Sequence, residues 1–233
     1  MLRALALGRC MQEQGFMLAL VAGVGGFLGA RLMEWPARSG SGRPFLLLQL
    51  ACAILFSFSF MIQGYNENAA ANFLRAAAVS AALYSSGVLW PLPPRNAHFF
   101  SRLLWLSFAL TVLGTWLVPC FPKLHVAMLH IIFIGGFSFM VFLIASMVTL
   151  SHSGVAEKLS HPLWVFKWVL AGVFLALAIR ISAQFFAQHY FKPLAVAASV
   201  WILTAAVWMG YCLPFVCRVP RAADREACGQ RGS

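Results

Sequence analysis

The stretch HVAMLHIIFIGGFSFMVFLIASMVTLSH, residues 125–152, decides the fold class, because it contains no Asp, Glu, Lys or Arg. A helix needs about 20 mostly apolar residues to cross a hydrocarbon layer of ~30 Å, since each residue adds about 1.5 Å. The apolar residues follow one another without the alternation of a membrane strand. The stretch therefore predicts a membrane-spanning helix.

The composition of the whole chain extends this prediction. Of its 233 residues, 61% are hydrophobic and only 10% are charged, and the mean hydropathy is +0.82. The 17 Lys+Arg and 6 Asp+Glu are too few to cover the surface of a water-exposed globule. A soluble enzyme and a disordered chain are thereby excluded, and we expect an all-α, polytopic transmembrane helix bundle.

Six further windows are long and apolar enough to cross, and connectors rich in Pro, Gly, Ser or Asn separate them. We therefore expect about seven helices, an N-terminal tail over 1–14, a transmembrane domain over 15–217 and a basic C-terminal tail over 218–233. The predicted crossings are 15–33, 45–64, 70–90, 102–120, 125–150, 163–187 and 194–217.

The basic residues indicate how the chain lies in the membrane. Most of the formal net charge of +11 is carried by short segments between apolar runs, where Lys and Arg meet anionic lipid, so the bilayer is the expected partner and nucleic acid is not. With seven crossings, eleven Lys and Arg share the side of the C-terminus and five, Arg75 among them, lie on the other side. The C-terminus is predicted to be cytoplasmic.

Two histidines of one helix are the first candidates for a site, because ionisable groups inside a bilayer are costly. His130 lies near the outer end of the predicted 125–150 helix and His152 closes it at the inner end. Their spacing corresponds to ~33 Å of rise and an offset of about 40° around the axis. Two separate sites, one near each surface, would suit two haems or one haem and one copper.

Each histidine also has a structural interpretation. His152 precedes Ser153 and Gly154, so its imidazolium would stabilise the negative end of a helix dipole. His130 would hydrogen-bond to a neighbouring helix, since a buried imidazole needs a partner for each ring nitrogen. His125 lies about 140° from His130 on the helical wheel and is either a loop or interface residue or a further metal ligand.

Arg180, in the segment ALAIR, lies inside the sixth predicted helix. A guanidinium at this depth needs an anionic partner or several carbonyls. A bound anion such as a haem propionate near His130 is one solution. The alternatives are that Arg180 extends to the lipid headgroups or bonds to Gln184 and Gln188.

Glycine pairs predict close approaches between helices. Gly25 and Gly29 have the spacing that lets another backbone approach, either within the chain or in a homo- or hetero-oligomer. Gly135 and Gly136 would make room for a macrocycle or for a neighbouring helix. No Ser/His/Asp set, H-E-x-x-H motif or phosphate-binding glycine loop occurs, so no catalytic residue is assigned and enzymatic activity stays open.

The stretch H130-I-I-F-I-G135-G-F-S-F-M140, followed by L150-S-H152-S-G154, resembles the NnrS family of polytopic proteins. The glycine-rich run QGFMLALVAGVGGFLGARLM, the segment ALAIR and the final helix before Arg218 resemble family segments in the same order. The resemblance is to the C-terminal half of the family only. The H-x-H-E-M type cluster of the family's earlier half is absent here.

The resemblance implies a haem- and copper-containing protein of the bacterial inner membrane that acts in denitrification and in the response to nitric oxide and nitrosative stress. On this reading His130 or His152 binds haem, Arg180 contacts a propionate, and His125 joins the other two histidines as a possible copper ligand. The competing hypothesis is a cofactor-free membrane module that pairs with another subunit or carries a small solute, which the missing cluster favours.

Overall fold

The computed structural model describes residues 7–33, 42–65, 69–186 and 190–217, and within these ranges it is all-helical, as predicted. The first rod contains η1 (Met11–Gly15), α2 (Phe16–Leu20), η2 (Val21–Gly25) and α3 (Gly26–Leu32), with π-helical turns in η1 and η2. The next three helices are α4 (Arg43–Tyr65), α5 (Ala69–Ser85) and α6 (Phe99–Cys120). The last three rods are α7–η4–α8 (His125–His130, Ile131–Ser138, Phe139–His152), α9 (Trp164–Ser182) and α10 (Phe191–Val216).

Five helices in the described ranges are long and apolar enough to cross a membrane: Arg43–Gly64, Phe99–Cys120, Pro122–His152, Trp164–Phe185 and Phe191–Val216. Together with the composition, they make the chain a membrane protein. The first rod is already helical at residue 7, upstream of the predicted residue 15. The predicted C-terminal tail, 218–233, lies outside the described residues.

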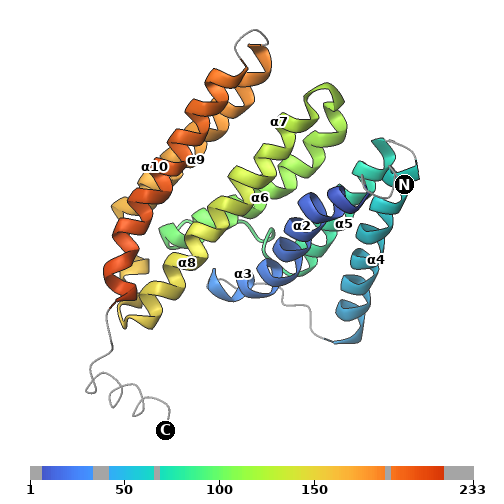
Figure 1. Ribbon diagram of the computed structural model, residues 1–233. Coiled ribbons are helices and arrows are strands. Elements are labelled where there is room, and N and C mark those ends of the chain that lie inside the picture. Colours follow the sequence, from blue (N-terminus) through green and yellow to red (C-terminus); the bar gives the residue numbers. More distant parts are fainter. Residues whose placement is uncertain (1–6, 34–41, 66–68, 187–189, 218–233) are drawn as a thin grey trace.

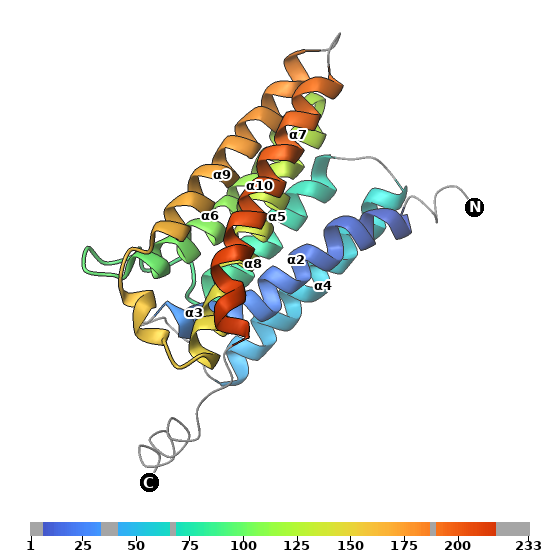
Figure 2. The ribbon, with the colours of Figure 1, turned by 60° about the vertical axis from the view of Figure 1, so that its left-hand side comes forward.

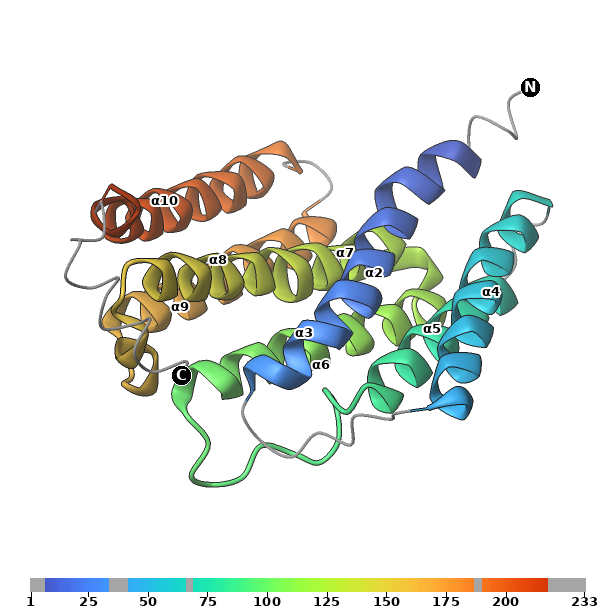
Figure 3. The same cartoon turned by 90° about the horizontal axis from the view of Figure 1, so that it is seen from below.

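The helices form two outer pairs around a central pair (Figure 1). On one side α4 packs against α5, and on the other α9 packs against α10. Between them α6 lies along the α7–η4–α8 rod, and the first rod crosses the bundle next to α5, as the view from below shows (Figure 3). This arrangement brings the ends of α7 and α9 to the same end of the molecule (Figure 2).

Glycines set the distances at the centre of the bundle. A Cβ on Gly29 would lie 2.6 Å from Phe108 of α6, and one on Gly25 would lie 3.1 Å from the same ring. The Gly25–Gly29 spacing is therefore used for a contact within the chain. Thr111 of α6 occupies the space beside Gly136, and its Cα would lie 3.2 Å from a Cβ added to that glycine. The glycine pair of η4 thus admits a neighbouring helix.

The lower end of α8 is closed by a Schellman turn. Gly154 has a φ of +72°, the left-handed conformation that glycine adopts most readily. The amide of Val155 donates to Leu150 and that of Gly154 donates to Ser151, which satisfies two of the last carbonyls of the helix. His152 lies in the last turn, where the structural interpretation of this residue placed it.

Candidate functional site: two buried arginines

Arg180 and Arg75 are the buried charged side chains of the described part of the chain, with 6% and 3% of their surface exposed. Arg180 lies in the last turn of α9, and Arg75 lies in the middle of α5. Neither takes part in an ion pair with a described residue; Arg9 and Glu13 form the one such pair in these ranges. Both guanidinium groups are therefore held by neutral partners.

Arg180 binds His130 and Tyr190 at the end of the bundle where α7, α9 and α10 meet. Its Nε donates to Nε2 of His130 at 3.2 Å, and its Nη2 donates to the hydroxyl of Tyr190 at 3.0 Å. The Tyr190 ring also lies 5.6 Å from the guanidinium carbon. The bond to His130 joins α9 to the end of α7, 50 residues away in sequence, and the bond to Tyr190 joins α9 to the residue that directly precedes α10.

Both ring nitrogens of His130 are engaged by protein atoms. Nδ1 lies 2.6 Å from the carbonyl oxygen of Val126, one turn earlier, and a carbonyl can only accept a hydrogen bond. Nδ1 therefore carries the proton, which leaves Nε2 as the acceptor for Arg180. The hydrogen-bond pattern assigns His130 as the neutral Nδ1–H tautomer.

One nitrogen of this site has no partner. Nη1 of Arg180 is buried and makes no hydrogen bond to any described residue. A buried donor without an acceptor is rare in proteins and costs about 1–3 kcal/mol, more for a charged group. The sequence predicted that Arg180 needs an anionic partner or several carbonyls, and neither is found at this nitrogen among the described residues. Gln184, a predicted alternative partner, forms no described bond to it, and Gln188 lies outside the described residues.

The other two predicted histidines do not join this cluster. His125 is the half-buried first residue of α7, one and a half turns from His130. His152 is exposed at the far end of the same continuous helix, ~33 Å of helix rise from His130. The structure thus brings together His130 and Arg180 of the four predicted residues. No group of three or more His, Cys, Asp or Glu in the described ranges could hold a metal ion.

Arg75 forms the second polar centre, which the sequence reasoning missed by assigning this residue only to the charge balance of the outer side. Its Nη1 donates to Gln14 at 2.7 Å, and its Nη2 donates to Gln63 at 2.5 Å. Nε reaches Ser59 at 3.2 Å, and Nη1 also reaches Asn72 at 3.3 Å. The ring of Phe60 stacks 3.7 Å from the guanidinium carbon. Four neutral oxygens and one ring surround this cation.

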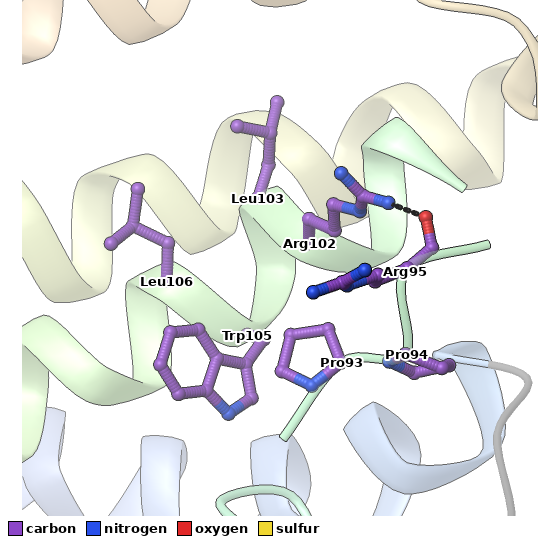
Figure 4. Close-up of a pocket in the computed structure, with 7 residues that line it drawn as sticks. All are labelled: Pro93, Pro94, Arg95, Arg102, Leu103, Trp105 and Leu106. Carbon is purple, nitrogen blue, oxygen red and sulfur yellow. Dashed lines mark hydrogen bonds between the residues drawn. The ribbon is translucent and has the colours of Figure 1, made fainter. Parts of the chain in front are cut away.

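A third basic feature lies on the surface. A pocket of about 460 Å³ at the start of α6 is lined by Arg95, Arg102, Trp105 and neighbouring residues (Figure 4). Arg102 donates to the backbone carbonyl of Arg95, and both side chains are exposed beside the rings of Pro93 and Trp105. Arginine and tryptophan at a helix end are typical of the membrane–water interface. None of the predicted site residues lines this pocket.

The fold and these sites define a polytopic helical membrane protein with two buried guanidinium centres. Residues 50–220 match the family model described as NnrS protein, and the chain belongs to this family. The resemblance inferred from the sequence is thereby confirmed, and the match contains α6 through α10 with His130 and Arg180. No curated protein and no solved structure matches the chain.

Proposed function

We propose that this NnrS-family chain is a membrane module of the nitric oxide response in which His130 positions Arg180 and does not bind iron. The observation that supports the proposal is the double engagement of the imidazole, by Val126 at Nδ1 and by Arg180 at Nε2. An iron or copper ligand needs a free nitrogen lone pair, and the lone pair of Nε2 accepts the Arg180 bond. Of the two hypotheses drawn from the sequence, the cofactor-free module fits this geometry better.

Haem, the group that the family implies, fits the residues of this chain poorly. The space beside Gly135 and Gly136, which follow His130, is occupied by side chains of α6. Leu110 would lie 3.2 Å from a Cβ on Gly135, and Thr111 lies against Gly136. His152 is exposed but lies at the opposite end of the bundle from Arg180. One macrocycle could not combine His152 as ligand with Arg180 as propionate partner.

A second candidate, haem binding after a rearrangement at His130, has one observation in its favour. The unpartnered Nη1 of Arg180 could donate to a carboxylate such as a propionate. The two candidates differ in what happens to the imidazole, because haem ligation would break the bond between Arg180 and His130.

An absorption spectrum separates these candidates. The protein is expressed with added haem precursor, purified in detergent, and assayed for a Soret band and for haem by the pyridine haemochrome method. We expect no stoichiometric haem in the wild type and an unchanged spectrum for His130→Ala. A stoichiometric Soret band that His130→Ala removes would contradict the proposal and favour the haem candidate.

The physiological part of the proposal is tested in the source organism. We expect deletion of the gene to slow growth under a nitric oxide donor, and we expect wild type to restore growth while Arg180→Met restores it incompletely. The exposed Arg102→Gln variant serves as the matched control and should restore growth fully. Equal growth of the deletion strain and the wild type under the donor would remove the nitric oxide role.

The orientation belongs to the same proposal. A cytoplasmic C-terminus in a bacterial inner membrane would place the turn between α9 and α10, and with it Arg180 and Tyr190, on the outer side. A reporter such as alkaline phosphatase, active only outside the cytoplasm, fused after residue 217 should be inactive. An active fusion there would reverse the orientation.

A further inference from the structure

We infer that Arg180 binds a small monovalent anion. Nη1 of the guanidinium and the hydroxyl of Tyr190 both donate hydrogen bonds to this anion. The inference goes beyond the proposed function. It shares with that function only the role of His130 as a positioning residue, and it names a ligand of different chemistry from haem.

Charge is the first step of the argument. A guanidinium does not lose its proton in proteins, so Arg180 brings a full positive charge into the bundle. Both of its described partners, a neutral imidazole and a phenol, leave that charge uncompensated. The negative end of the α9 dipole offsets part of it, because Arg180 lies in the last turn, but no described carbonyl accepts from Nη1.

Hydrogen-bond chemistry is the second step. The oxygen of Tyr190 accepts from Nη2 of Arg180, so the hydroxyl hydrogen of Tyr190 is free to donate elsewhere. Nη1 and Nη2 are neighbours in the planar fork of the guanidinium, and the hydrogens of Nη1 have no described acceptor. Two adjacent donors, one of them charged, are the recognition pattern for an anion.

Size and access are the third step. Nη1 has no contact with solvent, and Ala183, in the next turn, is completely buried. Only a small ligand can reach such a nitrogen without displacing a helix. The site lies in the last turn of α9, near the end of the bundle. These features favour an ion of the size of nitrite, nitrate or chloride.

The contrast with Arg75 shows that the inference is specific to Arg180. Arg75 is as deeply buried, yet each of its three nitrogens donates to a described side-chain oxygen. The second centre therefore has no nitrogen without a partner, and nothing there calls for an ion.

The test is a titration of the purified, detergent-solubilised chain with sodium nitrate, with sodium gluconate added to hold the ionic strength constant. Thermal unfolding is followed by tryptophan fluorescence. An ion that binds the folded state alone raises the midpoint in a saturable manner. We expect a saturable rise in wild type and in the exposed-arginine control Arg102→Gln, and none in Arg180→Gln.

Tyr190→Phe provides the second variant, in case Arg180→Gln does not fold. Loss of one hydrogen bond to a charged ligand should raise the half-saturating nitrate concentration about tenfold. The inference is overturned if wild type shows no saturable response to nitrate, nitrite or chloride, or if Tyr190→Phe or a folded Arg180→Gln responds as wild type does. The titration reports on the anion and the absorption spectrum reports on haem, so the inference and the proposed function can fail separately.

Discussion

The two buried arginines of this chain differ in how many hydrogen-bond acceptors surround their guanidinium groups. Arg75 is surrounded by side-chain oxygens from three helical rods, with Gln14 from the first, Ser59 and Gln63 from α4, and Asn72 from α5 itself. Arg180 has one imidazole, one phenol and an unpartnered Nη1. A saturated guanidinium stabilises the packing of its helices, whereas an unsaturated one is available to a ligand.

Burial of a charge does not by itself mark a functional site. Both side chains are almost fully enclosed, and both lie in apolar helices. What separates them is the number of acceptors that the fold supplies. Completeness of hydrogen bonding, and not depth, distinguishes the structural arginine from the candidate ligand site.

The largest expected effect comes from Arg75→Met. The substitution leaves the buried oxygen of Gln14 and the half-buried oxygens of Gln63 and Asn72 without this donor, and a fully buried group of this kind costs about 1–3 kcal/mol. Partial rearrangement reduces the sum, so we expect a loss of unfolding free energy of about 3 kcal/mol or more. The measurement is denaturant unfolding in mixed micelles together with the amount of protein in the membrane fraction. A variant as stable as wild type would show that the Arg75 cluster does not hold the helices together.

A second substitution makes the Arg75 centre resemble the Arg180 centre. Gln14→Leu removes the shortest acceptor of Nη1 and leaves Asn72 at 3.3 Å. We expect a loss of about 2 kcal/mol in the absence of small anions. Part of this loss should be recovered as nitrate is added, because Nη1 of Arg75 then keeps only the longer bond to Asn72. If the stability of Gln14→Leu is independent of nitrate, incomplete hydrogen bonding is not sufficient to create an anion site.

Arg180→Met is expected to cost less than Arg75→Met, about 1 kcal/mol in gluconate. It breaks the bonds to His130 and Tyr190, but it also removes the buried Nη1 that had no partner. In nitrate the deficit should grow, since only the wild type gains from the ion. The same unfolding assay in the two salts measures both values. An Arg180→Met deficit larger than that of Arg75→Met would reverse the comparison.

The smallest effect is expected for Tyr190→Phe in gluconate. The ring that lies beside Arg180 is kept and a single hydroxyl is lost, so the change should stay within about 1 kcal/mol.

Phe60→Leu at the other centre is the matched experiment, because it removes the ring that stacks on Arg75 at 3.7 Å. A cation–π contact at a desolvated site contributes about 2 kcal/mol, so Phe60→Leu should cost more. Equal losses of stability for Tyr190→Phe and Phe60→Leu would show that stacking of Phe60 on Arg75 does not stabilise the folded state.

The sequence predicted the fold class and the helix positions well because both follow from local apolar length. Continuous runs such as 125–152 admit one structure in a membrane. The structure places a helix in each predicted window, although α5 ends at Ser85, five residues before the end of the window 70–90. The sequence also selected His130 and Arg180, since each stands out as polar inside an apolar run. The C-cap role of Ser153 and Gly154 was likewise readable from their order after His152.

The sequence could not predict which side chains bind Arg180 and Arg75. That Arg180 donates to the ring of His130 depends on how α7 and α9 are rotated about their axes, which no single-helix pattern specifies. Tyr190 gave no signal because it lies in a connector. Arg75 did give one, as a lone cation inside an alanine-rich run, but its amide partners come from three separate segments. Their meeting is a property of the packed bundle.

The most direct test of the account is the protonation state of His130, read by ¹⁵N NMR of protein labelled at histidine and reconstituted in lipid, with His130→Gln used to assign the signal. The account predicts a neutral ring with the proton on Nδ1 and an unprotonated, hydrogen-bonded Nε2. An Nε2–H tautomer, an imidazolium, or a signal displaced by bound iron would contradict it.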